Sequence, residues 1–486
     1  MIRFITILCT LVLLCACDSN EATNPKYGKC IACHTMEVDK NHDIKCTSCH
    51  SGIDIAKKKD RAHQGLIAHP AHPSQMIKAC QPCHEDIVNT APLTIHFTLS
   101  NSTNMFRKAF GATTELQSFT DTPSIQDPTD ILELGDDLLR RRCFKCHIYD
   151  SGQPYPATSH GQGCAACHLS SSDSEQENHI FDSPTDKQCL SCHYGNYVGF
   201  DYYGRFEHDF NVEYRTPYTT KHDSFRTYGV EYHQLSADIH QQKGLSCIDC
   251  HTGNELMRSG NKPTCAGCHD AKDLAAQLPE RVSKKDNGYI LRAQSGMDHP
   301  IPTLTHPAHF TNSDSISCQA CHAQWSFDDR GKHFLRMDTD EIDSFSGLSV
   351  QGNYEIETLL TNNLDYDKDE LPIAMTDSLK GLPSIGIWLK GYVTRRWENV
   401  TLGRDTDGRI TVVRPILDYS LSWMDEDETV QFDAVPSQVD HGGLRPYTPH
   451  TTGSAGLFYQ ARIHQFLNQE KQMQNHQPDN QAQPNQ

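Results

Sequence analysis

The chain has 486 residues, a formal net charge of -19 at pH 7 and only 37% hydrophobic side chains. Such an acidic surface disfavours nucleic acid as a partner, and it favours basic partners or soluble cations. The hydrophobic fraction is low for a core of this length, so we expect other groups to fill the interior.

The N-terminal segment resembles a bacterial lipoprotein signal. Arg3 precedes an apolar run from Phe4 to Leu14, and Cys15-Ala16-Cys17 follows. Residues 1–16 are predicted to be a signal peptide, Cys17 the lipidated first residue of the mature chain, and 17–25 its linker. An ordinary secretory signal is the alternative. Either signal would deliver the chain outside the cytoplasm. The lipid anchor would hold it in the cell envelope of a bacterium, at a periplasm-facing or outer-membrane surface.

Nine copies of Cys-x-x-Cys-His begin between Cys30 and Cys318 and use 18 of the 21 cysteines. Two thiols at this spacing can each bond one vinyl group of haem, and the next histidine then lies under the iron as an axial ligand. Zinc sites and redox-active cysteine pairs share the cysteine spacing but do not need that histidine. Only 28 of the 486 residues are histidine, so nine adjacent histidines are not chance. The motifs predict nine covalent c-type haems, and these would supply the missing core.

The predicted ligands follow directly from the motifs. The thioether cysteines are Cys30, Cys33, Cys46, Cys49, Cys80, Cys83, Cys143, Cys146, Cys164, Cys167, Cys189, Cys192, Cys247, Cys250, Cys265, Cys268, Cys318 and Cys321. The proximal iron ligands are His34, His50, His84, His147, His168, His193, His251, His269 and His322.

The other 19 histidines exceed the nine that full bis-histidine ligation would need. His42 and His160 each lie four residues before a motif, and the segment His-Pro-Ala-His occurs ahead of both Cys80 and Cys318. Surface histidines in loops are the alternative. The candidate distal ligands are His42, His69, His72, His160, His179, His240, His306, His309 and His450.

The nine motifs cover about 60% of the chain and resemble those of multihaem c-type cytochromes of respiratory and extracellular electron transfer. The His-x-x-His segments resemble those of class III and trihaem cytochromes. This resemblance implies a lipid-anchored electron carrier of anaerobic respiration. Its donor would be another cytochrome or a quinol-linked protein, and its acceptor a further cytochrome, a metal oxide or a soluble compound.

A more distant resemblance is to octahaem reductases of nitrogen and sulfur oxyanions, in which one haem binds substrate. The chain has no Cys-x-x-Cys-Lys motif, which argues against the lysine-ligated nitrite reductases, but a tetrathionate reductase-like enzyme stays open. A subunit of a conductive filament is a third alternative, against which the lipid anchor argues. No catalytic residue is assigned from the sequence.

The expected fold is a multihaem cytochrome fold of loops and short α-helices around stacked haems, followed by a haem-free β-rich region. In chain order we predict trihaem modules at 26–99, 129–200 and 241–330, separated by a loop insertion at 100–128 and a connector at 201–240. A helix beginning after Thr129 or Asp130 should lead into Cys143. Eight of the 18 tyrosines lie between Tyr194 and Tyr232. Packing against porphyrin is favoured for these rings over a substrate pocket.

The β-rich region is predicted at 331–467. Alternating apolar residues indicate strands, and Asp407-Gly408 and the segment 425–428 each mark the turn of a hairpin. A final helix is expected from Leu457 to Leu467, followed by a disordered tail at 468–486 that is rich in Gln, Asn and Pro.

Overall fold

The computed structural model describes residues 28–34, 36–170, 177–196, 198–208, 227–258, 260–286, 288–341, 351–363, 373–391, 400–455 and 458–475. It is a mixture of helices and strands, about 37% helical and 20% strand. The predicted signal peptide, Cys17 and the end of the tail lie outside these residues. Within the described ranges, no helix is both long and apolar enough to cross a membrane.

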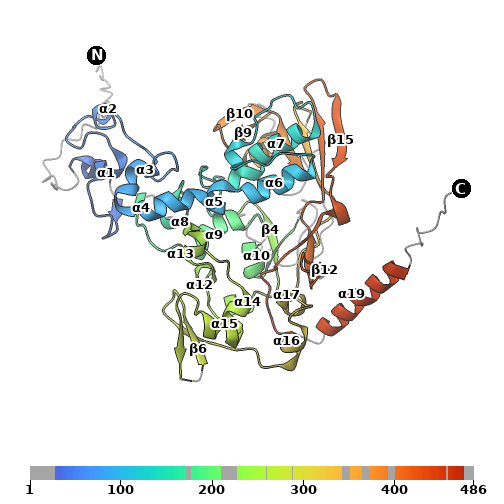
Figure 1. Cartoon of the computed structure of the whole chain (residues 1–486). Coiled ribbons are helices and arrows are strands. Elements are labelled where there is room, and N and C mark those ends of the chain that lie inside the picture. The colour runs from blue at the N-terminus through green and yellow to red at the C-terminus, as the bar shows by residue number, and fades with distance from the viewer. Residues whose placement is uncertain are drawn as a thin grey trace, which may run out of the picture. The chain divides into compact units, whose positions relative to one another are not determined.

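The chain forms two compact units, and the first consists of Met1–Asn89 and Gln162–Ser183. Its elements are short (Figure 1). They are η1 (Cys30–Ala32), β1 (Met36–Val38), α1 (Cys46–His50), α2 (Lys59–Ala62), α3 (Met76–Ala79), α4 (Gln81–Thr90), α8 (Cys164–His168) and β2 (Glu177–His179). Strands β1 and β2 pair in parallel, with Val38 opposite His179.

Unit 2 consists of Thr90–Gly161 and Pro184–Gln486. The unit boundaries differ from those of the three predicted trihaem modules, because the motif at Cys164 belongs to unit 1 and its neighbours at Cys143 and Cys189 belong to unit 2. The helices of unit 2 are η2 (Ala91–Leu93), α5 (Ile95–Thr98), α6 (Ser100–Ala109), η3 (Phe119–Asp121), α7 (Ile131–Arg141), η4 (Cys143–Cys146), α9 (Asp186–His193), α10 (Val198–Tyr202), α11 (Ile239–Gln242), α12 (Cys247–Cys250), α13 (Gly253–Arg258), α14 (Cys265–His269), α15 (Ala271–Ala276), α16 (Pro307–Asn312), α17 (Cys318–His322), α18 (Tyr354–Asn363), η6 (Asp440–Gly443) and α19 (Phe458–Asn475).

The strands of unit 2 form several small sheets. A four-stranded sheet has the order β11 (Ile387–Lys390), β8 (Lys332–Met337), β14 (Tyr419–Met424), β15 (Val430–Pro436). Its central pair, β8 and β14, is parallel and its outer pairs are antiparallel. The remaining strands are β3 (Arg205–His208) with β4 (Glu231–Gln234), β5 (Val282–Lys285) with β6 (Gly288–Arg292) and β7 (Asp298–Ile301), β9 (Ala374–Asp377) with β10 (Leu382–Ile385), and β12 (Leu402–Arg404) with β13 (Ile410–Pro415) and β16 (Leu444–Pro446).

Both predicted hairpins are confirmed. Asp407-Gly408 joins β12 to β13, and the segment 425–428 joins β14 to β15. Gly408 has a φ of 80°, a left-handed conformation that glycine adopts without steric cost. The predicted helix before Cys143 is α7, and its N-cap is Asp130, whose carboxylate accepts a hydrogen bond of 2.9 Å from the Glu133 N–H.

The main apolar core joins α6, α7 and the fourth motif to the C-terminal sheet. It contains Phe106, Leu138 and Phe144 together with Trp388 and Leu421. Residues 100–109 were expected to lie in a surface loop, and here the prediction was wrong, because they form α6. Buried polar side chains of α6 have hydrogen-bond or ion-pair partners. Asn104 exchanges two 2.8 Å hydrogen bonds with the Leu116 backbone, and Arg107 forms an ion pair with Asp136.

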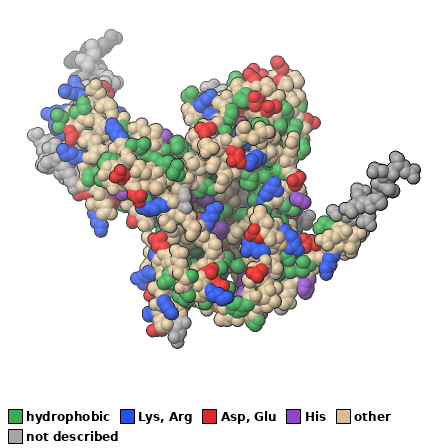
Figure 2. All heavy atoms as spheres, in the orientation of Figure 1, with side chains coloured by type: hydrophobic (Ala, Val, Ile, Leu, Met, Phe, Trp, Pro, Cys, Tyr) green, Lys and Arg blue, Asp and Glu red, His purple; other side chains and the backbone are tan. Residues whose placement is uncertain are grey.

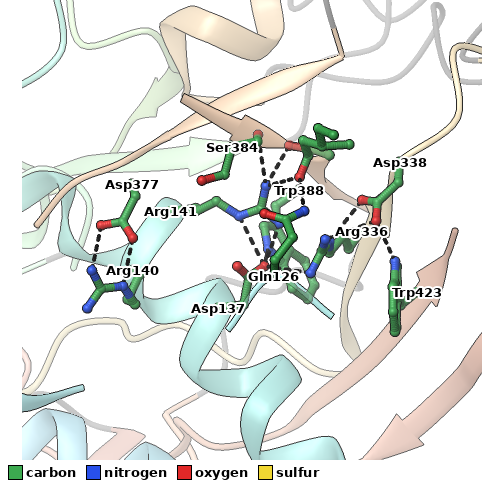
Figure 3. A network of polar contacts seen from close by, with 12 residues as sticks. Gln126, Asp137, Arg140, Arg141, Arg336, Asp338, Asp377, Ser384, Trp388 and Trp423 are labelled. Carbon is green, nitrogen blue, oxygen red and sulfur yellow. Dashed lines mark hydrogen bonds and ion pairs between the residues drawn. The ribbon is translucent and has the colours of Figure 1, made fainter. Parts of the chain in front are cut away.

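A buried polar network fastens α7 to the strands (Figure 3). The Arg141 guanidinium donates to Asp137 at 2.6 Å and to the carbonyls of Ile385 and Gly386 at 2.7 Å. Asp137 also accepts from the Trp388 indole at 2.8 Å. One residue earlier in the helix, Arg140 makes a two-point ion pair with Asp377, at 2.8 and 2.9 Å. The residues just before the fourth motif are therefore held in place by the C-terminal region.

The last helix is longer than predicted. Helix α19 runs to Asn475, so residues 468–475 of the expected disordered tail are helical. An ion pair contributes to this extension, because Arg404 donates two hydrogen bonds, of 2.8 and 2.6 Å, to Glu470.

On the face drawn in Figure 2, acidic and basic side chains are interspersed.

Candidate metal centres

Most of the nine motifs fold as one short helical turn. Four of them, α1, α8, α14 and α17, are five-residue helices that span the whole Cys-x-x-Cys-His sequence. Positions three and four apart share one face of a helix, so both cysteines and the histidine point to the same side. Caps fix where these turns begin: the Thr264 hydroxyl accepts from the Gly267 N–H at 3.0 Å at the start of α14.

Seven motif histidines face a second histidine across a gap of nearly constant width. Three of the pairs lie in unit 1 and four in unit 2. The separations between ring centres are 6.0 Å for His34–His63, 6.2 Å for His42–His84, 5.8 Å for His50–His179, 6.2 Å for His96–His193, 6.1 Å for His240–His269, 6.3 Å for His251–His450 and 6.1 Å for His309–His322.

This separation is the one that a shared metal ion requires. A metal–imidazole bond is roughly 2 Å long, so two imidazoles on opposite sides of one ion have ring centres roughly 6 to 6.5 Å apart. Rings in direct contact stand closer, as Phe106 and Phe110 do at 4.9 Å. Each pair combines one motif histidine with one histidine from elsewhere in the chain. The residues present therefore fit a haem iron with two axial histidines.

Hydrogen bonds that Nδ1–H donates orient many of the motif histidines and their partners. The Nδ1 atoms of His50, His168, His269 and His322 lie 2.8 to 3.0 Å from the carbonyl oxygens of Ile67, Asp182, Pro302 and Gly453. Nδ1 of His251 contacts the Glu255 carboxylate at 2.9 Å, and His42 and His240 contact Asp39 and Asp238 at 2.8 Å. A proton held at Nδ1 leaves the Nε2 lone pair available for a metal.

Burial keeps several of the paired imidazoles neutral, which is the form that binds a metal. Burial, together with the neighbouring His96, lowers the pKa of His193 to about 4. Burial also lowers the pKa of His96, His269 and His450. An uncharged ring at neutral pH does not have to lose a proton before it binds iron.

The sequence prediction and the structure overlap in part. Five predicted distal residues, His42, His179, His240, His309 and His450, face a motif histidine. Two residues in such pairs were not predicted. His63 follows the short helix α2, and His96 lies in α5. Neither has a fixed spacing to a motif, so no local signal marks them.

The other predicted distal histidines have different surroundings. His306 caps α16 and its ring lies 6.2 Å from that of His309. His160 Nε2 is 3.7 Å from the Cys192 sulfur, and His72 Nδ1 is 2.8 Å from the Ser74 hydroxyl. For His69 the structure gives no ring pairing among the described residues. His160 therefore lies beside the sixth motif, although it precedes the fifth in sequence.

The fourth motif has its own local structure. Residues Cys143–Cys146 form a 3-10 turn, and His147 follows in an extended conformation. The His147 ring is 4.7 Å from Phe119 and 5.8 Å from Tyr149, and its Nδ1 accepts the Tyr149 N–H at 2.8 Å. This ring therefore lies in an aromatic setting unlike that of the paired histidines.

Thiol contacts show which motifs are neighbours. In unit 1, Cys30 is hydrogen-bonded to Cys46, Cys49 interacts with Cys80, and Cys80 is hydrogen-bonded to Cys164. The motifs in unit 1 therefore follow one another in the order first, second, third, fifth. None of the 18 motif cysteines forms a disulfide.

Unit 2 has a second row of the same kind. Its hydrogen-bonded thiol pairs are Cys146–Cys192, Cys189–Cys247 and Cys265–Cys318, and Cys250 interacts with Cys268. The order in unit 2 is fourth, sixth, seventh, eighth, ninth. Each row is continuous within its own unit.

Comparison of the chain with protein-family models, with curated proteins and with solved structures gives no match. In the ranges that the structure describes, no three His, Cys, Asp or Glu side chains converge as ligands of one ion.

Proposed function

We propose that this protein is a nonahaem c-type cytochrome that carries electrons along rows of closely spaced haems. The observation that supports this best is the set of seven histidine pairs, each of which joins a motif histidine to a second imidazole at the separation that an axial pair on iron needs. An iron with two histidine ligands has no open position, so it exchanges electrons rather than binding substrate. The haems would supply one-electron chemistry, and the chain would set their spacing and potentials.

The order of the rows follows from the thiol contacts. Each thiol would be bonded to the rim of its own porphyrin, so motifs whose thiols touch hold neighbouring haems. In unit 2 the sixth haem would connect the fourth to the seventh, eighth and ninth. In unit 1 the fifth haem would follow the third.

The predicted signal sequence supports a location in the cell envelope for this electron transfer. A lipid on Cys17 would hold the protein in a bacterial cell envelope, where c-type haems are attached. Its partners would be another cytochrome or a quinol-linked donor, and a soluble, mineral or protein acceptor. The acidic surface suits contact with basic patches on such partners.

The test removes one haem from within a row. The double variant Cys189→Ala with Cys192→Ala lacks the sixth haem, and the matched control, Cys318→Ala with Cys321→Ala, lacks the terminal ninth. After flash reduction, electrons should equilibrate over the remaining haems of unit 2 much more slowly in the first variant than in the control. Equal rates in the two variants would contradict the proposed order of haems in unit 2. A wild-type protein that carries no haem would contradict the proposed electron-carrier function.

A further inference from the structure

A loop of unit 1 concentrates positive charge in an otherwise acidic chain. Residues 51–67 contain four basic and two acidic side chains, whereas the whole chain has a formal net charge of -19. The basic residues are Lys57, Lys58, Lys59 and Arg61, and all four are exposed. Within the described part of the chain, none of them forms an ion pair. Their charges are therefore available to a partner outside the chain.

Backbone contacts fix the shape of this loop. Ser51 and Leu66 form an antiparallel bridge at its ends, and the Ile53 N–H donates to the Ala62 carbonyl at 2.9 Å. The four basic residues lie between these closures, in α2 and the two residues before it. Figure 2 shows Lys and Arg side chains at the end of unit 1 that carries α2. The fold thus presents the four charges together.

The described chain begins against this loop. The Lys29 N–H donates to the Asp54 carbonyl at 2.8 Å. Gly28 lies so close that a Cβ there would be 2.6 Å from the same oxygen. Gly28 follows Cys17 by eleven positions, and a chain of that length spans at most about 40 Å. A lipid on Cys17 would therefore hold the loop close to a membrane.

A bacterial membrane offers the opposite charge. Anionic phospholipid headgroups give the lipid surface a negative potential, which attracts lysine and arginine side chains within about 10 Å of it. Each such residue strengthens attachment roughly fivefold, so four on one loop act together. The rest of the chain is acidic and would be repelled by the same potential. The two effects together would turn this loop toward the lipid.

We propose that the loop of residues 51–67 lies on an anionic phospholipid surface. This inference rests on the predicted lipid anchor at Cys17, and its consequence for electron transfer rests on the proposed haem loading. His63 belongs to the same loop, and its ring centre lies 6.0 Å from that of His34. The first haem would therefore lie beside the lipid-facing loop, at one end of the row in unit 1. It is the haem of this row that would exchange electrons with a membrane-bound partner.

The test uses the full-length, lipidated and haem-loaded protein on two kinds of vesicle, pure phosphatidylcholine and an equal mixture of phosphatidylcholine and phosphatidylglycerol. The anchor holds the protein on both, so the comparison isolates the charge of the lipid. Mass spectrometry follows the acetylation of each lysine. Lys57, Lys58 and Lys59 should react several-fold more slowly on the anionic vesicles, whereas Lys284 and Lys285, which are exposed on β5, should react equally on both. Salt at 1 M shortens the screening length to about 3 Å and should abolish the difference.

A variant provides the second readout. Lys58→Gln with Lys59→Gln and Arg61→Gln should remove the protection of Lys57 on anionic vesicles. The matched control replaces the two β5 lysines by Gln and should keep that protection. Equal acetylation of the loop lysines on the two kinds of vesicle would overturn the inference and would make an acidic protein the better partner for the loop. Equal slowing at the β5 lysines would overturn it too.

The failure of each proposal is distinguishable. A mature protein whose mass lacks the lipid would refute the anchor and this inference with it. A lipidated, haem-loaded protein with equal acetylation on both vesicles would refute the membrane contact and leave the electron carrier standing. A protein without haem would refute the carrier, and the acetylation rates would still decide the membrane contact.

Discussion

Replacing Arg141 by Met tests whether the C-terminal sheet holds the fourth motif. The side chain of Arg141 is only 1% exposed, and it serves both Asp137 and the carbonyls that connect β10 to β11. Met keeps much of the volume but removes the guanidinium donor from these carbonyls and one of the two cationic partners of Asp137, which keeps Arg336 at 3.5 Å and the Trp388 indole at 2.8 Å. Breaking a buried ion pair by removing one partner costs about 3–5 kcal/mol, so we expect a loss of that size in local stability.

Hydrogen exchange is the suitable assay, because it reports the opening free energy of each segment and does not require the two units to unfold together. Amides of β8 and β11 should lose about 3–5 kcal/mol of protection in Arg141→Met. The matched control is Arg292→Met, whose 2.9 Å ion pair with Asp298 is 61% and 50% exposed on its two sides. Exposed pairs contribute about 0–1 kcal/mol, so the control should change little. Equal protection in the two variants would refute the role given to Arg141.

Three further predictions concern ligation, haem attachment and pH. The ring centre of His63 lies 6.0 Å from that of His34, so His63→Ala should convert one low-spin haem to high spin in EPR. The control variant His464→Ala, at an exposed position of α19, should leave the spectrum unchanged. An unchanged spectrum for His63→Ala would show that His63 is not an iron ligand. Gly163→Ala should lower haem attachment at the fifth motif, because the added Cβ would lie 1.9 Å from the Ala71 carbonyl oxygen. The control is Gly65→Ala, at a glycine with a similar φ and open space around it. The intact masses of the two variants give their haem content, and equal content would contradict this prediction. Burial raises the pKa of Asp201 to about 7, so the folded protein keeps this proton up to about pH 7, whereas the unfolded chain releases it near pH 4. The free energy of unfolding should therefore fall by up to about 4 kcal/mol as the pH rises from 4 through 7. Asp201→Asn should flatten that slope in urea unfolding measured at several pH values, and an unchanged slope would show that another group titrates.

The sequence predicted the elements that local chemistry determines. Asp130 has the oxygen that an N-cap needs, and Asp407-Gly408 has the residue types of a tight turn. The motif cysteines and histidines stand out because they recur at one fixed spacing, which the proposed covalent attachment of haem would require. These features depend on neighbours within a few residues, so a single sequence reveals them.

Features that depend on tertiary contact were missed. His63 and His96 become distal candidates only because the folded chain brings them opposite His34 and His193. The polar sequence of α6 predicted a surface loop. In the structure Asn104 is hydrogen-bonded to Leu116 and Arg107 is ion-paired with Asp136, so both polar side chains can be buried. The anchoring of the fourth motif by the C-terminal strands pairs residues more than 200 positions apart, such as Arg140 with Asp377. No local pattern encodes such pairs.

The intact mass of the mature, haem-loaded protein tests the central claim most directly. We expect the mass of the processed chain plus nine haems, which denaturation should not remove because each haem would be bound through two thioether bonds. A mass equal to that of the bare chain, or of the chain with zinc ions that leave on denaturation, would contradict it.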